Sequence, residues 1–357
     1  MNNLKKYGAS ERYFAEATLY PDLHLARVIS QYKDMYKIVT EQNEFLAEIS
    51  GKFRYNVNCL SDYPAVGDFV MVDRNDEHSG NAVIHNVLTR KSLFERTAVG
   101  NDNEMQVVAA NIDIVFICMS LNNDYNLSRL ERYLSVAYNS LAMPAVVLTK
   151  SDLCANLPAV LAEISNVALG ADVIVTSSFD QASCDELLSY LKPGVTASFI
   201  GSSGVGKSTL INRLAGKELL STSGLRNDDK GRHTTTRREL FALPTGGVVI
   251  DTPGMRELGA ESSDLSKSFA DIDELTAHCR FRDCTHTNEP GCAVLNAIET
   301  GELDERRFKN YLKLKREAKY EGLSSRQLES EKLNIMFKDI GGMKNMKNFI
   351  KEKNKRR

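Results

Sequence analysis

Short runs of alternating apolar and polar residues fill the first quarter of the chain. Five such runs occur, at residues 25–30, 35–40, 44–50, 68–72 and 82–88. A period of two is typical of strands that bury one face, and residues 65–68 supply a turn before the fourth run. Five short strands within about 65 residues predict a small closed β-barrel, with the OB-fold as the leading candidate. We interpret residues 89–104 as a linker that leaves this barrel.

Basic and aromatic residues interleave between the third and fourth runs. Lys52, Phe53, Arg54 and Tyr55 follow one another directly. This arrangement suits RNA contact, because aromatic rings stack on bases and cations attract the backbone. The alternative is an ordinary amphipathic strand pair.

A different pattern begins after residue 105. Mostly apolar runs replace the alternation, and small or polar residues follow each of them; the runs lie at 112–119, 146–148, 173–175, 197–200 and 248–250. Such runs are typical of strands buried on both faces. They predict a doubly wound α/β sheet, in which a ligand binds at the carboxyl ends of the strands.

The run at 197–200 leads into a P-loop. The pattern G-x-x-x-x-G-K-[ST] is complete, and a helix-like run follows at 210–214. Backbone N–H groups of such a loop point at phosphate oxygens, and the helix N-terminus adds a positive dipole. Lys207 is expected to reach the β- and γ-phosphates, and the Ser208 hydroxyl is expected to bind Mg²⁺. The expected nucleotide-binding residues here are Gly201, Ser202, Ser203, Gly204, Val205, Gly206, Lys207, Ser208 and Thr209.

A candidate guanine-reading motif follows the run at 146–148. Thr149, Lys150, Ser151 and Asp152 resemble the [NT]-K-x-D motif of GTPases, whose Asp accepts hydrogen bonds from guanine N1–H and the exocyclic amine. Adenine presents the opposite pattern at that edge. A strand followed by a charged turn is the bland alternative. The next apolar run ends in small hydroxyl residues that include Ser177, as expected of a loop behind the base.

The run at 248–250 ends in D-x-x-G. Asp251 is expected to hold Mg²⁺ through water, and the N–H of Gly254 to meet the γ-phosphate. The string 231–236, G-R-H-T-T-T, lies between the P-loop and this motif. One of its threonines is expected to bind Mg²⁺, and we favour Thr235 slightly over its neighbours. The base motif precedes the P-loop by about 50 residues, the reverse of the usual order; a doubly wound sheet tolerates this permutation.

Three cysteines and a histidine cluster near the C-terminus. The spacing C-x4-C-x-H-x5-C places Cys279, Cys284, His286 and Cys292 within 14 residues. Three thiolates and one imidazole form a closed tetrahedral set, which is the composition of a structural Zn²⁺ site without an open position. His278 competes for the nitrogen ligand, but it directly precedes Cys279 and is expected to point away.

Composition fits a soluble intracellular chain. The formal net charge is −2, and no run is long and apolar enough for a membrane span or a signal peptide. Charge is uneven, however, because residues 338–357 carry eight Lys or Arg and two acidic residues. Such a tail is more often a solvated end than a binding arm. The other cysteines read as reduced, buried thiols: Cys59, Cys118, Cys154 and Cys184.

These motifs together resemble one protein family. The order T-K-S-D, G-S-S-G-V-G-K-S-T, D-T-P-G, the string G-R-H-T-T-T and the Cys3His cluster are similar to those of RsgA small-subunit biogenesis GTPases, also called YjeQ or YloQ. The resemblance spans residues 25 to 319. It implies GTP hydrolysis stimulated by the small ribosomal subunit during late maturation, contact with rRNA, one structural Zn²⁺, and Mg²⁺ with GTP.

Five parts of the chain are expected on this basis. They are an N-terminal extension (1–24), an OB-fold domain (25–96), a circularly permuted GTPase domain (105–262), a mainly α zinc-binding domain (263–325) and a basic tail (326–357). We expect a cytoplasmic monomer. The alternative is an RNA-binding assembly factor whose nucleotide site is a timer with negligible intrinsic turnover. A metabolic enzyme is not supported, because no second set of convergent catalytic groups is found.

The hydrolysis step requires a positioned water. Ras-like GTPases use a Gln directly after D-x-x-G, but Met255 stands there. His233 is the best candidate to hold the water; the alternative is a switch-loop histidine that contacts rRNA. K⁺ dependence is doubtful, because Gly204 replaces the Asn that holds K⁺ in related P-loops.

Overall fold

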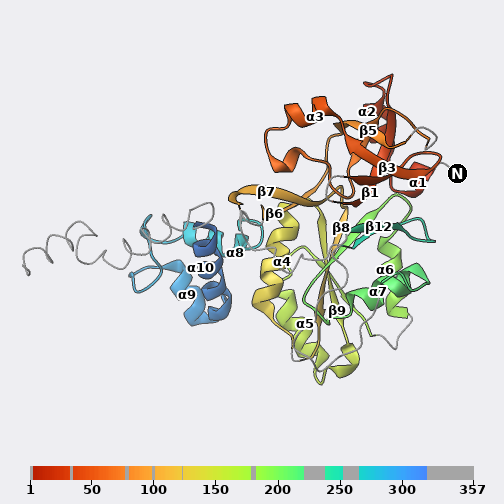
Figure 1. Ribbon diagram of the computed structural model, residues 1–357. Coiled ribbons are helices and arrows are strands. Elements are labelled where there is room, and N and C mark those ends of the chain that lie inside the picture. Colours follow the sequence, from red (N-terminus) through yellow and green to blue (C-terminus); the bar gives the residue numbers. More distant parts are fainter. Residues whose placement is uncertain are drawn as a thin grey trace, which may run out of the picture.

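The computed structural model describes residues 3–32, 35–76, 80–98, 101–122, 124–177, 182–220, 238–251 and 265–319 (Figure 1). Several predicted residues lie outside these ranges: the string 231–236 with His233 and Thr235, the residue Gly254, and the tail 326–357. Within them, no helix combines the length and apolar character needed to cross a bilayer.

Five strands near the N-terminus close into a barrel. They are β1 (His24–Gln31), β2 (Tyr36–Val39), β3 (Glu44–Ile49), β4 (Phe69–Val72) and β5 (Ala82–Val87). The pairings run β1–β2–β3–β5–β4 and return to β1, and only β3 and β5 are parallel. The predicted five-stranded barrel is therefore confirmed. Alternation explains it: in β3 Phe45 and Ala47 face the core, while Glu44, Leu46 and Glu48 are exposed.

Short helices surround the barrel. They are α1 (Asn3–Lys6), α2 (Glu11–Ala17), α3 (Gly51–Asn56) and the 3₁₀ turn η1 (Leu60–Asp62). The segment of interleaved basic and aromatic residues forms α3. The alternative interpretation of this segment as an amphipathic strand pair was therefore wrong. Ser50 caps α3, because its hydroxyl accepts from the Phe53 N–H at 3.0 Å. Tyr55 is 90% exposed on this helix.

A β-hairpin follows the barrel, where a linker was predicted. It consists of β6 (Leu93–Ala98) and β7 (Asn101–Ala110), paired antiparallel. The linker interpretation was wrong because polar residues dominate the whole segment 89–104 and hide a strand whose Phe94 is only 1% exposed. Figure 1 shows the hairpin between the barrel and the central sheet.

The central domain is a doubly wound sheet. Its strands are β8 (Ile114–Ser120), β9 (Met143–Thr149), β10 (Asp172–Val175), β11 (Thr196–Ile200), β12 (Glu239–Ala242) and β13 (Val248–Asp251). They lie in the order β10-β9-β8-β11-β13-β12, and all pairs are parallel except β12–β13. The helices are α4 (Leu127–Asn139), α5 (Leu157–Ser165), α6 (Ala182–Tyr190), α7 (Lys207–Ala215) and the turn η2 (Ser151–Leu153).

Both faces of this sheet are buried. In β8, Val115 and Ile117 pack in one apolar cluster with residues of α4 and α5, while Phe116 and Cys118 pack in another with residues of α6 and α7. A strand covered on both faces needs no polar side, which explains the continuous apolar runs. The predicted α/β sheet is confirmed, and β9 with the base motif precedes β11 with the P-loop.

The barrel continues the central sheet. Ser30 of β1 pairs with Glu239 of β12. Arg27 is completely buried at this junction; it donates to Gly67 O and to Thr196 Oγ1 at 3.1 Å each, and its guanidinium lies 4.7 Å from the Phe69 ring centre. Burial lowers the pKa of Arg27 to about 10.

The C-terminal part is helical, as predicted. It contains α8 (Ala270–Ala277), α9 (Ala293–Thr300) and α10 (Glu305–Lys319) around a small core that includes Phe269, Ile272 and Leu314. Figure 1 shows α10 on the side of the central domain that carries α4.

The scattered cysteines are free, but not all are buried. Cys118 and Cys184 are buried, and burial raises the pKa of Cys118 to about 12. Cys59 is exposed and Cys154 is half-buried, so the prediction was wrong for these two. Cys59 lies in the loop between α3 and η1.

Candidate nucleotide and metal sites

The P-loop follows directly from β11. Gly201 has φ +139°, and a Cβ atom there would lie 2.2 Å from the carbonyl oxygen of Cys118 on β8. Gly204 and Gly206 also have positive φ, +74° and +98°, and Gly206 is the N-cap of α7. The glycines therefore let the chain turn against the central strand and enter the helix, as a phosphate-binding loop requires.

Lys207 is folded back onto this loop. Its Nζ donates to Gly201 O and Ser202 O at 2.6 Å each. Ser208 and Thr209 follow it in the first turn of α7. The ammonium group thus lies over the loop, where the phosphates of a nucleotide would be cradled.

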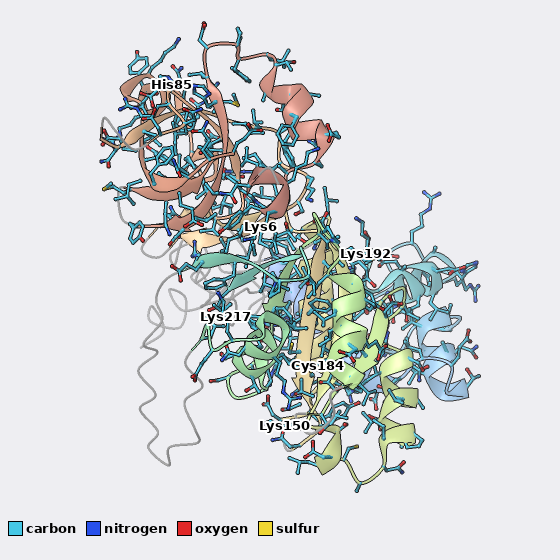
Figure 2. All side chains as sticks on the ribbon, turned by 90° about the vertical axis from the view of Figure 1, so that its right-hand side faces the viewer. Lys6, His85, Lys150, Cys184, Lys192 and Lys217 are labelled. Carbon is cyan, nitrogen blue, oxygen red and sulfur yellow. The ribbon has the colours of Figure 1, made fainter. Side chains whose placement is uncertain are left out.

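The base motif contacts the P-loop directly. Thr149 Oγ1 donates to Val205 O at 2.6 Å, and Lys150 Nζ donates to Gly204 O at 2.7 Å. Lys150 has φ +56°, a left-handed conformation that starts the turn η2. Figure 2 shows Lys150 at the end of the central domain that is far from the barrel. Motifs about 50 residues apart in sequence therefore form one site at the carboxyl ends of the strands.

Asp152 and Ser177 meet beside this contact. The Ser177 hydroxyl donates to Asp152 Oδ1 at 2.7 Å, and Ser151 N–H donates to Thr176 O at 3.2 Å. The loop after β10 therefore backs the loop after β9, in the arrangement expected around a guanine base. Asp152 is exposed, so its second carboxylate oxygen is accessible to a ligand.

Asp251 ends β13, next to the P-loop strand. Burial raises the pKa of Asp251 to about 6; the positive charge of Lys207 opposes this shift, and Glu239 adds to it. Asp251 and Ser208 offer a carboxylate and a hydroxyl at the same end of the sheet. Oxygen ligands of this kind suit Mg²⁺. The other expected Mg²⁺ ligand, Thr235, lies outside the described residues.

The C-terminal cysteines and one histidine converge. The ligand atoms of Cys279, Cys284, His286 and Cys292 all lie within 4.8 Å of one another. His286 Nδ1 is 3.6 Å from Cys279 Sγ and 3.4 Å from Cys292 Sγ. His278 instead places its Nδ1 2.8 Å from Glu274 O on its own helix. The four side chains form a closed donor set that can hold a metal ion.

The backbone around this donor set favours thiolates. Cys292 is the N-cap of α9, and its Sγ accepts from the Leu295 N–H at 3.4 Å. Burial alone would raise the pKa of Cys279, but backbone N–H groups of Val294 and Ala293 outweigh it and lower that pKa. A helix N-terminus stabilises negative sulfur, which is the form that binds metal.

The loop between these ligands is held by Glu289. Its carboxylate accepts from the Thr285 hydroxyl, and from the N–H groups of Thr285 and Thr287 at 2.8 and 2.9 Å, and these bonds hold the pKa of Glu289 far below its usual range. His286, between the two threonines, has φ +57°. The loop geometry is therefore set by a carboxylate that the motif spacing did not single out.

Two further contacts were not predicted from the motifs. Arg129 of α4 donates to Ser202 Oγ in the P-loop and, at 2.7 Å, to Asp124 Oδ1. Glu131, two residues later, is buried against α10. Neither residue belongs to a recognisable motif, so only the tertiary structure reveals them.

Comparison with known proteins identifies relatives over nearly the whole chain. A family model described as RsgA GTPase matches residues 87–261. The chain is 47% identical over 346 residues to the small ribosomal subunit biogenesis GTPase RsgA 2 of Lactiplantibacillus plantarum, covering 97% of each protein. It is 45% identical over 320 residues to RsgA 2 of Listeria monocytogenes, covering 89% of this chain and 90% of the relative.

Solved structures agree with this relationship. The crystal structure of YjeQ from Thermotoga maritima matches with a TM-score of 0.60 and 29% identity, over 83% of this chain and 98% of that one. The structure of YloQ, described as a circularly permuted GTPase, matches with a TM-score of 0.57 and 26% identity, over 83% and 95% of the two chains. Three kinds of comparison therefore indicate one family.

Proposed function

This chain belongs to the RsgA family of circularly permuted GTPases, and we propose that it binds the small ribosomal subunit, acts in its late maturation and hydrolyses GTP to GDP and phosphate with stimulation by that subunit. Its partners are this subunit, its rRNA and the guanine nucleotides. The protein acts as a monomer without membrane attachment.

The contact between the base motif and the P-loop carries this proposal. The bonds from Thr149 to Val205 and from Lys150 to Gly204 join the two motifs despite their reversed order in the chain. A guanine base beside Asp152 would then be continuous with phosphates over the P-loop. Asp152 accepts from guanine N1–H and the 2-amino group, and Ser177 orients the carboxylate from behind.

The P-loop binds the phosphates in this proposal. Backbone N–H groups of residues 201–209 surround them, and Lys207 exchanges its bonds to Gly201 O and Ser202 O for phosphate oxygens. Gly254 would meet the γ-phosphate, and Ser208, Thr235 and Asp251 would hold Mg²⁺. That ion would neutralise charge that develops on the phosphoryl oxygens.

His233 is the proposed water-positioning residue, because Met255 cannot hydrogen-bond a water. A neutral imidazole beside the proposed Mg²⁺ threonine could orient the nucleophile for in-line attack. Positioning a water, rather than covalent chemistry, is what phosphoryl transfer requires of the protein.

The closed Cys3His donor set supports one structural Zn²⁺ held by Cys279, Cys284, His286 and Cys292. Zn²⁺ would cross-link the loop before α9 to the end of α8 and would contribute folding free energy to the C-terminal helices. With four protein ligands there is no open coordination position, so the ion has a structural role.

Phosphate release tests the function. GTP turnover is measured for the protein alone, with purified small subunits and, as a control, with large subunits. We expect at least tenfold faster turnover with small subunits and no change with large ones. Binding to small subunits in the presence of GTP without any turnover would support the alternative of a slow timer. Absence of both binding and stimulation would overturn the proposal.

A further inference from the structure

Helix α4 touches the P-loop on one side through Arg129. The Arg129 guanidinium donates to Ser202 Oγ and to Asp124 Oδ1, so it bridges the P-loop and the loop before α4. Ser202 is also bonded through its carbonyl oxygen to Lys207 Nζ, at 2.6 Å. Arg129 and Lys207 therefore hold the same P-loop residue from its side chain and its backbone.

On its opposite side, α4 contacts α10 of the C-terminal domain. Glu131 is 1% exposed, and its carboxylate accepts from Arg307 Nη1 at 3.0 Å, from Arg306 Nη1 at 3.4 Å and from Asn310 Nδ2. Residues two apart on a helix point to different sides. Arg129 thus faces the P-loop while Glu131 faces α10.

Arg307, which binds Glu131, is itself held by several residues of the C-terminal domain. Arg307 is 3% exposed; it also pairs with Asp271 at 2.8 Å, donates to Ser268 O at 2.9 Å and lies 4.8 Å from the Phe269 ring centre. A buried charge that loses its partner is costly, so Glu131 and Arg307 hold α4 and the C-terminal domain together. The place of α4 then depends on that domain as well as on the apolar face that packs against β8.

The contact between Arg129 and Asp124 is weaker than the contact between Glu131 and Arg307. Asp124 Oδ2 is buried and has no hydrogen-bond partner among the described residues, and a cavity of about 10 Å³ lies beside Asp124, Arg129 and Ser202. This space is at the lower limit for one water. A buried carboxylate oxygen without a partner is costly, and both side chains of the Arg129–Asp124 pair are 37% exposed, so this pair contributes little to fixing Arg129, whose position depends mainly on α4.

We propose that Arg129 is a positioning residue for the P-loop, and that the C-terminal helical domain sets its place through the Glu131–Arg307 contact on α4. A displacement of α10 moves α4 as a rigid body, shifts Arg129 and changes how Ser202 presents the P-loop to the nucleotide phosphates. The proposal rests on the nucleotide-binding role of the P-loop and adds a route by which the C-terminal domain acts on it.

Equilibrium binding of GDP and GTP to the full chain tests the Arg129 contact. Arg129→Gln is expected to weaken both nucleotides roughly 5- to 30-fold, because a charged hydrogen bond to the P-loop is lost. Arg129→Lys, which keeps one charged donor, should recover part of the affinity. In a Ser202→Ala background Arg129→Gln should add little. A purely structural defect would instead lower the number of binding sites and leave the dissociation constant unchanged.

The matched control is Arg132→Gln. Arg132 lies one helical turn after Arg129 and pairs at 2.7 Å with Glu317 of α10, with both side chains about one-third exposed. This pair also joins α4 to α10, but a partly exposed pair contributes little beside the buried Glu131–Arg307 contact, so this variant should keep nucleotide affinity within twofold. An equal loss in Arg129→Gln and Arg132→Gln would overturn the role of Arg129.

Coupling to the C-terminal domain is tested with Glu131→Gln. This variant should weaken GDP binding about 3- to 10-fold in the parental chain and have no further effect in the Arg129→Gln background. If Glu131→Gln does not fold, Arg306→Gln, at a partly exposed position, is the milder substitute. By linkage, GDP should slow hydrogen exchange in α10 of the parental chain but not in Arg129→Gln.

Two results would overturn the coupling. One is that the effects of Glu131→Gln and Arg129→Gln on GDP binding are additive in the double variant. The other is that GDP protects α10 from hydrogen exchange equally in the parental chain and in Arg129→Gln. Failure of the proposed function is distinguishable from this result. It would appear as absent GTP binding or absent subunit stimulation in the parental protein, before any variant is compared.

Discussion

Replacing Gly201 with alanine should be far more damaging than replacing Gly204, although both are P-loop glycines with positive φ. At Gly201 the new Cβ would lie 2.2 Å from Cys118 O, 3.1 Å from the carbonyl carbon and 3.3 Å from the Cys118 Cβ. At Gly204 nothing lies within 4 Å. The two substitutions therefore add the same methyl group to the same loop and differ mainly in what it meets.

The magnitude follows from these contacts. Relieving the clash at Gly201 requires a backbone shift of about 1 Å against β8, where Cys118 is 2% exposed. Overpacking of this kind costs about 1–3 kcal/mol, and the unfavourable φ adds about 1–3 kcal/mol. We expect a loss of about 4 kcal/mol for Gly201→Ala, against about 1–2 kcal/mol for Gly204→Ala, where only the left-handed conformation is penalised.

Urea unfolding without nucleotide measures the difference. The chain contains no tryptophan, so far-ultraviolet circular dichroism or tyrosine fluorescence is the probe. With a slope of about 2–3 kcal/mol/M, a loss of 4 kcal/mol lowers the midpoint by more than about 1 M. Equal, small midpoint shifts for the two variants would refute the reasoning, because Gly201 could not then be pinned against Cys118 O.

Three other predictions concern ligands. Asp152→Asn should weaken GTP by about 30- to 150-fold and favour xanthosine triphosphate, because a hydrogen bond from guanine to a charge is lost; unchanged GTP affinity in a titration would remove Asp152 from the site. Cys284→Ser should lower zinc from about one ion per chain and loosen the C-terminal helices while GTP binding survives, and metal analysis of protein purified without chelator checks this. His233→Ala should keep GTP affinity within a few-fold but reduce subunit-stimulated hydrolysis by roughly 10²-fold, whereas Lys207→Ala should reduce both; parental turnover of His233→Ala on small subunits would show that another group positions the water.

Features whose cause is local could be predicted from the sequence. The P-loop glycines, the turn after Thr149 and the spacing of Cys279, Cys284 and Cys292 each reflect a requirement of a few adjacent residues. The barrel strands were predicted because each buries one face, so apolar and polar residues alternate within each strand. Local requirements of this kind leave a pattern that needs no knowledge of distant partners.

Features that depend on distant partners could not be predicted. Charged residues on a helix are expected to face solvent, but Glu131 is buried because Arg307, 176 residues away, reaches it. Phe94 is buried in a strand that lies within a mostly polar segment, residues 89–104. Cys59 was expected to be buried on the average behaviour of cysteine, yet it is exposed in the loop before η1.

The two accessory domains reach the P-loop by different physical routes. The barrel is joined to the central sheet by the β1–β12 pairing and by Arg27, which bonds Thr196 at the start of β11, the strand that ends at Gly201. Backbone pairing and a fully buried guanidinium leave this junction little freedom, so the barrel moves with the sheet. The contact of α10 with α4 depends instead on side-chain charges centred on Glu131. Because breaking this buried charge contact is costly, α4 moves with α10 in the proposed coupling, and the movement is passed to the P-loop through Arg129 rather than through the sheet.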